Sequence, residues 1–234
     1  MIPKLIHQTA KTSELPIDCR AYVAKLKTLH PDWKYQLWTD DDNLAFVKEE
    51  FPDFLDTFQA YPRNIMRADV IRYLIMYRLG GFYLDTDYEM LKAFDLCENE
   101  IVLCWEPNPQ SPDKPLKIAN AIFASSPGHP FFGMLIDQLK RDATPSQTAD
   151  VEMTTGPGFV TRVFGDAVQN RGLRLEPTAP ILFSPITPRN EREYQAIVQN
   201  GKSYGIHHCF GTWRSFSLAQ RIKLRLKWLL SRYL

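Results

Sequence analysis

A helix-like segment that runs directly into an apolar strand constrains the fold more than any other feature of the sequence. Between positions 64 and 79, apolar residues recur at steps of three and four, which is the spacing of an α-helix. Gly80-Gly81 ends this pattern, and Phe82-Tyr83-Leu84 follows as a short apolar run typical of a buried strand. Helical and strand-like segments alternate along the chain, so the sequence predicts a single α/β domain.

The other elements are predicted from the same patterns. Further strands are expected at 4–7, 35–38, 101–105, 121–124, 181–183 and 204–208, and further helices at 18–30, 42–60 with a break at Pro52, 130–140 and 159–169.

The composition excludes several classes of protein. The chain has 234 residues, of which 44% are hydrophobic and 24% charged, so neither disorder nor a disulfide scaffold is expected. A net charge of +1 argues against a nucleic-acid binder. The start of the sequence lacks the apolar stretch of a signal peptide, and no apolar run is long enough for a membrane span. The four cysteines lack CxxC spacing, which favours reduced thiols in a cytoplasmic protein that is soluble or peripheral to a membrane.

The last 18 residues differ from the rest of the chain. Residues 217–234 contain five basic residues and no acidic one. One side of a helix over this segment would carry Leu218, Ile222, Leu226, Leu229, Leu230 and Tyr233. We therefore predict a domain at 1–216 followed by a basic amphipathic helix at 217–234. This helix is expected to lie on an anionic membrane surface; the alternative is that it packs its apolar side against the domain.

Two aspartates follow the strand at 82–84. In extended backbone, residues i and i+2 project to the same side, so Asp85 and Asp87 can both face one ligand. Carboxylate oxygens suit Mg²⁺ or Mn²⁺, and open α/β sheets bind ligands at the carboxyl ends of their strands. The alternative is a solvated acidic turn, because two aspartates at this spacing are common.

Other polar residues lie on the helix that precedes these two aspartates and at the end of a late predicted strand. Arg67, Asp69 and Arg72 are on the preceding helix, where Asp69 and Arg72 share a face and can bind sugar hydroxyl groups or each other. His207 and His208 end a predicted strand, and one imidazole could complete a metal site or contact phosphate. Because neighbouring residues of a strand point in opposite directions, at most one of the two is expected to be a ligand.

Five sequence strings together resemble glycosyltransferase family 32. They are IPKLIHQTAKT near the start, LWTD at 37–40, RADVIRYLIMYRLGGFYLDTD at 67–87, TGPG at 155–158 and IHHCFGTW at 206–213. This family of DXD-containing sugar transferases includes initiating mannosyltransferases of yeast and bacterial enzymes of capsule and lipopolysaccharide synthesis. The resemblance implies a GT-A fold, a Rossmann-like domain with a mostly parallel sheet that binds a nucleotide-sugar, and retention of anomeric configuration.

The resemblance also implies a role for each matching residue. Asp87 would be the principal metal ligand; Asp85 would contact the donor ribose or sugar and the metal, and His207 the metal or the diphosphate. Asp69 and Arg72 match positions that hold donor sugar hydroxyl groups, and they complete the expected catalytic set. The other expected donor contacts are Ile6, His7, Gln8, Trp38, Thr39, Arg67 and Trp213, and the expected acceptor contacts are Asn120 and Gly156.

We therefore predict a retaining glycosyltransferase that depends on Mn²⁺ or Mg²⁺. It would move a sugar from a UDP- or GDP-linked donor to a glycan or lipid-linked acceptor, in surface polysaccharide synthesis at the inner face of the cell membrane. No nucleophilic carboxylate can be identified, so displacement on one face of the sugar is the working mechanism. Two alternatives remain: a glycoside hydrolase that uses paired carboxylates without a metal, and a carbohydrate-binding module without activity.

Overall fold

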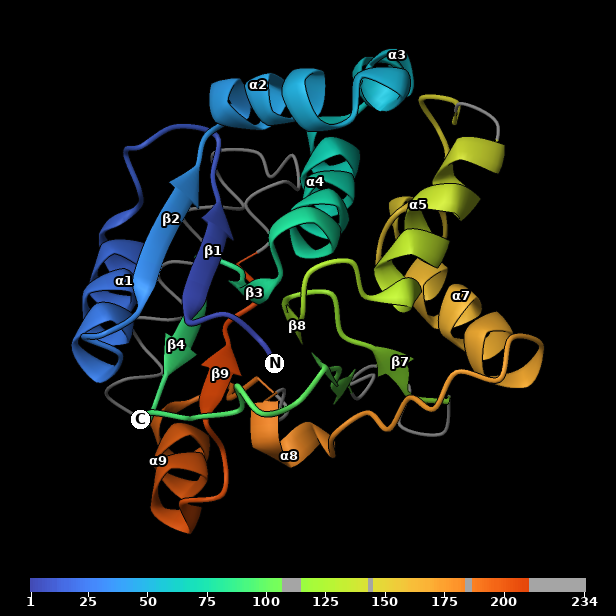
Figure 1. Ribbon diagram of the computed structural model, residues 1–234. Coiled ribbons are helices and arrows are strands. Elements are labelled where there is room, and N and C mark those ends of the chain that lie inside the picture. Colours follow the sequence, from blue (N-terminus) through green and yellow to red (C-terminus); the bar gives the residue numbers. More distant parts are fainter. Residues whose placement is uncertain (107–114, 143–144, 184–186, 211–234) are drawn as a thin grey trace.

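A five-stranded sheet forms the centre of the computed structural model, which describes residues 1–106, 115–142, 145–183 and 187–210 (Figure 1). The strand order is β2-β1-β3-β8-β5. β1 pairs in parallel with β2 and β3, whereas β8 is antiparallel to both β3 and β5. β8 is thus the reversed strand in this sheet, and the predicted α/β fold with a mostly parallel sheet is confirmed. The strands are β1 (Leu5–Thr9), β2 (Lys34–Trp38), β3 (Gly81–Leu84), β5 (Ile101–Val102) and β8 (Ile122–Ser125).

Helices cover both faces of the sheet. The larger core lies where α4, α5 and α7 pack together, and it includes Tyr83 and Phe123 from the sheet. The second core includes Phe82 and Leu84, which alternate with Tyr83 along β3, and Leu26 of α1. The helices are α1 (Ile17–Leu29), α2 (Asp40–Glu50), the 3-10 turn η1 (Pro52–Phe54), α3 (Leu55–Ala60), α4 (Asn64–Leu79), α5 (Pro130–Arg141), α6 (Val151–Thr154), α7 (Pro157–Gln169), α8 (Pro180–Phe183) and α9 (Glu191–Asn200).

The link between α4 and β3 confirms the strongest sequence prediction. α4 spans Asn64–Leu79, and the chain turns at once into β3. Gly80 and Gly81 have φ values of 62° and 92°, which only glycine adopts without strain. A side chain at Gly81 would also meet the carbonyl oxygen of Leu5 at 2.5 Å, so this glycine lets β3 lie directly beside β1.

Two short ribbons stand apart from the central sheet. β4 (Tyr88–Met90) pairs with β9 (Gly205–His207), and β6 (Trp105–Glu106) pairs with β7 (Lys117–Ile118), both antiparallel. The first ribbon carries the chain away from Asp85-Thr86-Asp87, so it places a late segment of the sequence beside that turn (Figure 1).

Two predicted strands differ in the structure. Residues 181–183 belong to the helical turn α8, because Pro180 fits the first turn of a helix and the Leu182 N–H donates to Ala179. The predicted strand at 101–105 is divided into β5 and β6, because Leu103 and Trp105 exchange backbone hydrogen bonds with Thr178.

The predicted helix at 217–234 and Trp213 lie outside the described residues. Among the residues that are described, no helix combines the length and the apolar character needed to cross a bilayer.

Candidate functional site

The turn after β3 holds two carboxylates. The Tyr88 N–H donates to the Asp85 carbonyl at 3.0 Å, which closes a turn over Asp85, Thr86 and Asp87. The expectation that extended backbone aligns the two aspartates is therefore wrong. The turn reverses the chain between β3 and β4, and it brings both side chains to one side by folding back. The Gln8 side chain donates to the Asp85 carbonyl at 3.0 Å and ties this turn to β1.

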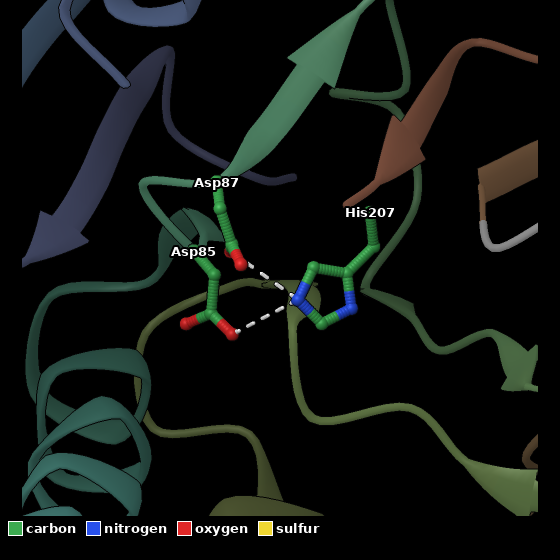
Figure 2. A group of neighbouring side chains, drawn as sticks. All are labelled: Asp85, Asp87 and His207. Carbon is green, nitrogen blue, oxygen red and sulfur yellow. Dashed lines mark ion pairs between the residues drawn. The ribbon is translucent and has the colours of Figure 1, made fainter. Parts of the chain in front are cut away.

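His207 lies against both carboxylates, as Figure 2 shows. Its Nε2 atom is 3.3 Å from Asp87 Oδ1 and 3.7 Å from Asp85 Oδ2. One ligand atom from each of the three residues lies within 4.8 Å of the others. The three side chains keep between 15 and 23% of their surface exposed, so the group is enclosed but open to a ligand.

The two neighbouring histidines point in opposite directions. His207 faces the two aspartates, whereas the His208 ring lies 3.0 Å from Glu89 Oε2 and stacks on Tyr22. Of this pair, only His207 lies in the acidic group.

The acidic group fits a divalent cation in its chemistry. Two carboxylates and one imidazole supply two oxygen ligands and one nitrogen ligand, a set compatible with Mn²⁺ or Mg²⁺. Burial alone would lower the pKa of His207, but its hydrogen bond to Asp87 raises that pKa well above the usual value. Asp87 stays charged, because His207 and the Phe210 N–H outweigh burial and lower its pKa.

An arginine buried beneath the turn holds Asp85. Arg72 Nη1 lies 3.2 Å from Asp85 Oδ1 and 2.5 Å from the carbonyl oxygen of Asn120. Its Nη2 lies 3.3 Å from Asp69, and the side chains of Asp69 and Arg72 are each only 4% exposed. The guanidinium also lies over the ring of Tyr83, 4.8 Å from its centroid. Arg72 thus joins α4, β3 and the segment before β8 directly behind the acidic turn.

Asp69 is enclosed by hydrogen bonds as well. Its Oδ1 accepts from the Asn120 side chain at 3.0 Å, and its Oδ2 accepts from the Thr155 hydroxyl at 2.9 Å. Burial raises the pKa of Asp69 to about 6, although Arg72 opposes this rise. A direct contact of Asp69 and Arg72 with a donor sugar stays a prediction; the contacts in the structure point to a role in holding Asp85.

Three further residues lie in or near this arrangement without having been predicted from the sequence. The Tyr83 hydroxyl donates to Asp85 Oδ1 at 2.8 Å, and it exchanges a hydrogen bond of 2.9 Å with Thr9. Thr155 reaches Asp69 from the segment before α7, although it belongs to the TGPG string that the sequence singled out. Glu106 of β6 is a further carboxylate near the site. Burial raises its pKa, and it interacts electrostatically with His207 and Asp85. For Tyr83 the available signal was its position two residues before Asp85 on the strand.

The remaining predicted donor residues fall into two groups. The side chains of Ile6, His7 and Gln8 are buried, so β1 can offer a ligand only its backbone and the edge of the turn. Trp38 donates to His7, and Thr39 caps α2 by accepting from the Asp42 N–H. Arg67 donates to Asn64 and to the Tyr61 carbonyl at the start of α4, away from the hydrogen bonds of the acidic turn.

The two predicted acceptor residues lie around Asp69. Asn120 contacts both Asp69 and Arg72, and Gly156 immediately precedes α7 beside Thr155. They stay predictions as acceptor contacts.

Comparison with known proteins gives a consistent picture. Residues 16–103 match the family described as the glycosyltransferase sugar-binding region containing the DXD motif. The inositol phosphoceramide mannosyltransferase 2 of Schizosaccharomyces pombe is 34% identical over 200 residues, covering 83% of this chain and 54% of that protein. The mannosyl phosphorylinositol ceramide synthase SUR1 of Saccharomyces cerevisiae is 43% identical over 141 residues, covering 60% of this chain and 35% of that protein. The chain thus spans about half or less of the length of these relatives.

A more distant relative and a solved structure extend the comparison. The initiation-specific alpha-1,6-mannosyltransferase of Candida albicans is 25% identical, covering 84% of this chain and 58% of that protein. The solved structure of the PaToxG glycosyltransferase superimposes with a TM-score of 0.52 at 15% identity, covering 99% of this chain and 87% of that one. This likeness concerns the fold alone, and it confirms the GT-A type fold predicted from the sequence.

Proposed function

Because the chain belongs to the family of glycosyltransferases whose sugar-binding region contains the DXD motif, we propose that it transfers mannose from a nucleotide-linked donor to a lipid-linked acceptor. The observation that carries the proposal is the grouping of Asp85, Asp87 and His207 at the end of β3. Mannose as the sugar is supported by the names of two relatives, one an inositol phosphoceramide mannosyltransferase and the other a mannosyl phosphorylinositol ceramide synthase.

Asp85, Asp87 and His207 would hold Mn²⁺ or Mg²⁺. Such a cation, when bound, supplies positive charge where the departing nucleoside diphosphate becomes more negative. The protein's own part is to keep the ligands in place. Asp85 is fixed through Oδ1 by Tyr83 and Arg72, so its Oδ2 faces His207. Asp87 is fixed through Oδ2 by the Phe210 N–H, so its Oδ1 faces the same point.

The same residues favour reaction at the anomeric carbon. This carbon gains positive charge as the glycosidic bond to the diphosphate breaks, and a fixed carboxylate nearby stabilises that charge. Arg72 supplies positive charge beside Asp85, with its Nη1 3.2 Å from Oδ1 and 3.5 Å from Oδ2. We propose retention of configuration, in which the acceptor hydroxyl enters on the face that the diphosphate leaves.

The proposal is tested by binding and by turnover. Purified protein is titrated with GDP-mannose, UDP-glucose, UDP-galactose and UDP-N-acetylglucosamine, each with and without Mn²⁺, while the melting temperature is followed. A ligand at a hundredfold its Kd stabilises the folded state by about 2.7 kcal/mol, which shifts the melting temperature by several degrees. We expect the shift with GDP-mannose only when Mn²⁺ is present.

Two variants make this test specific. Asp87→Asn removes the charge of one ligand and should abolish the shift. Asp166→Asn changes an exposed ion pair between α7 and Arg171, which follows this helix, and should leave the shift intact. Transfer to inositol phosphoceramide and to mannose oligosaccharides is then compared, with the product anomer identified by NMR. Absence of any nucleotide-dependent shift in the wild-type protein would refute the donor site.

A further inference from the structure

A second carboxylate network lies directly behind the acidic group. Glu89, in the middle of β4, has a side chain only 9% exposed, and both of its oxygens are hydrogen-bonded. Oε1 accepts from Lys25 of α1 at 2.8 Å and from the Tyr194 hydroxyl of α9 at 2.9 Å. Oε2 accepts from His208 Nε2 at 3.0 Å. Three donors from three parts of the chain thus meet at one buried charge.

This network is tied to the candidate metal ligands through the backbone. The His208 N–H donates to the Asp87 carbonyl at 3.1 Å, and the Phe210 N–H donates to Asp87 Oδ2 at 2.8 Å. Cys209 between them has a φ of 52°, a left-handed conformation that turns the chain back toward Asp87. The segment 207–210 therefore wraps around Asp87, and its position depends on whatever holds His208.

His208 is held by two kinds of contact. Its Nε2 donates to Glu89, and its ring stacks on Tyr22 of α1 with centroids 4.9 Å apart and planes 6° apart. Because His207 and His208 point to opposite sides, fixing one ring sets the rotation of the strand and so the direction of the other. A buried charge needs its partners, so Glu89 resists any movement that would release His208.

We propose that Glu89 and His208 are positioning residues, which set His207 and the Phe210 N–H against Asp87 and thereby determine the affinity of the site for a divalent cation. The inference rests on the proposed function, since it concerns the same site. Residues that orient metal ligands from behind typically change metal affinity by 10- to 100-fold when they are replaced.

The experiment measures Mn²⁺ affinity of the full chain, without donor, from the electron paramagnetic resonance signal of free Mn²⁺. His208→Phe keeps a flat ring to stack on Tyr22 but cannot donate to Glu89. His208→Gln loses the ring but can place an amide N–H near Glu89. Glu89→Gln places an N–H where the His208 N–H points, and Glu50→Gln makes the same change in the surface ion pair with Arg78.

We expect His208→Phe and Glu89→Gln to weaken Mn²⁺ binding by about 10- to 100-fold. His208→Gln should recover most of the affinity, and Glu50→Gln should match the wild-type protein. If His208→Phe does not fold, the Mn²⁺ affinity of Glu89→Gln is compared with that of Glu50→Gln, which tests the same contact through its carboxylate partner. Wild-type affinity in Glu89→Gln, or full affinity in His208→Phe with loss in His208→Gln, would overturn the inference. Absence of Mn²⁺ binding by the wild-type protein would instead refute the proposed metal site itself.

Discussion

His7 is buried on β1 beside the acidic turn, and its burial can be tested through the pH dependence of the free energy of unfolding. His7 is 1% exposed, and the Trp38 indole N–H donates to its Nδ1 at 3.1 Å. An indole nitrogen is only a donor, so Nδ1 carries no proton and the hydrogen is on Nε2, which donates to the Gly80 carbonyl at 3.0 Å. A second proton would set two N–H groups against each other. Burial, opposed by the bond to Gly80, lowers the pKa of His7 to about 4.

The magnitude follows from the difference between the folded and unfolded states. The unfolded chain binds a proton at His7 below its ordinary pKa of 6.5, whereas the folded chain does so only near pH 4. The contribution of His7 to the free energy of unfolding is therefore fully present above pH 6.5, and it is lost as the pH falls from about 6.5 to about 4. The full difference corresponds to about 3.4 kcal/mol. About 2 kcal/mol of this should be lost between pH 7 and pH 5.

The assay is urea unfolding of the wild-type protein and of His7→Gln at pH 7 and at pH 5. Glutamine does not titrate, and its amide can still donate to the Gly80 carbonyl. All other titrating groups are common to both proteins, so they cancel in the comparison. We expect the wild-type free energy of unfolding to fall by about 2 kcal/mol more than that of the variant. An equal fall in both proteins would show that His7 is not held neutral, and would refute the reasoning.

Three further predictions concern the turn and the residues behind it. Gly81→Ala should destabilise the protein by at least about 1–3 kcal/mol, because Gly81 has a φ of 92° and a side chain there would meet the Leu5 carbonyl oxygen. Gly165→Ala, at an open position of α7, should instead stabilise the protein by up to about 1 kcal/mol. Equal effects of the two variants in urea unfolding would contradict this. Thr155→Val should cost about 1–3 kcal/mol because it leaves Asp69 Oδ2 without its donor, and Thr155→Ser should restore stability; a neutral valine variant would show that this bond is not needed. EDTA should lower the melting temperature of the Mn²⁺-loaded wild-type protein but not that of Asp87→Asn, and identical curves would argue against metal binding at this turn.

Local patterns predicted the parts of the fold that depend on local causes. The periodicity at 64–79 and the two glycines defined α4 and the start of β3, because the helix is amphipathic and only glycine suits the turn. The apolar run at 181–183 was misassigned, since a segment of three or four apolar residues has no readable period. The polar helix α9 was missed, although Asn190 accepts from the Glu193 N–H in the manner of a helix cap.

The site was predicted only as far as its residues lie in recognisable strings. Asp85, Asp87 and His207 were named, and the structure groups them. Tyr83 lies only two residues before Asp85, but the contacts behind the site join distant positions: Thr155 before α7 donates to Asp69, and Glu89 on β4 accepts from His208. No spacing in the sequence relates these two pairs, because their contacts exist only after the sheet and the ribbon of β4 and β9 have formed.

The ribbon of β4 and β9 has a consequence for how members of such a family can differ in length. It pairs residues 115 to 119 positions apart, so a long stretch of chain enters and leaves the site through two neighbouring strands. Closing a flexible loop costs only about 0.6 kcal/mol more each time its length doubles. Segments inserted into the loops between β4 and β9 would therefore leave the two aspartates and the histidine in register, while they change the surface around the site.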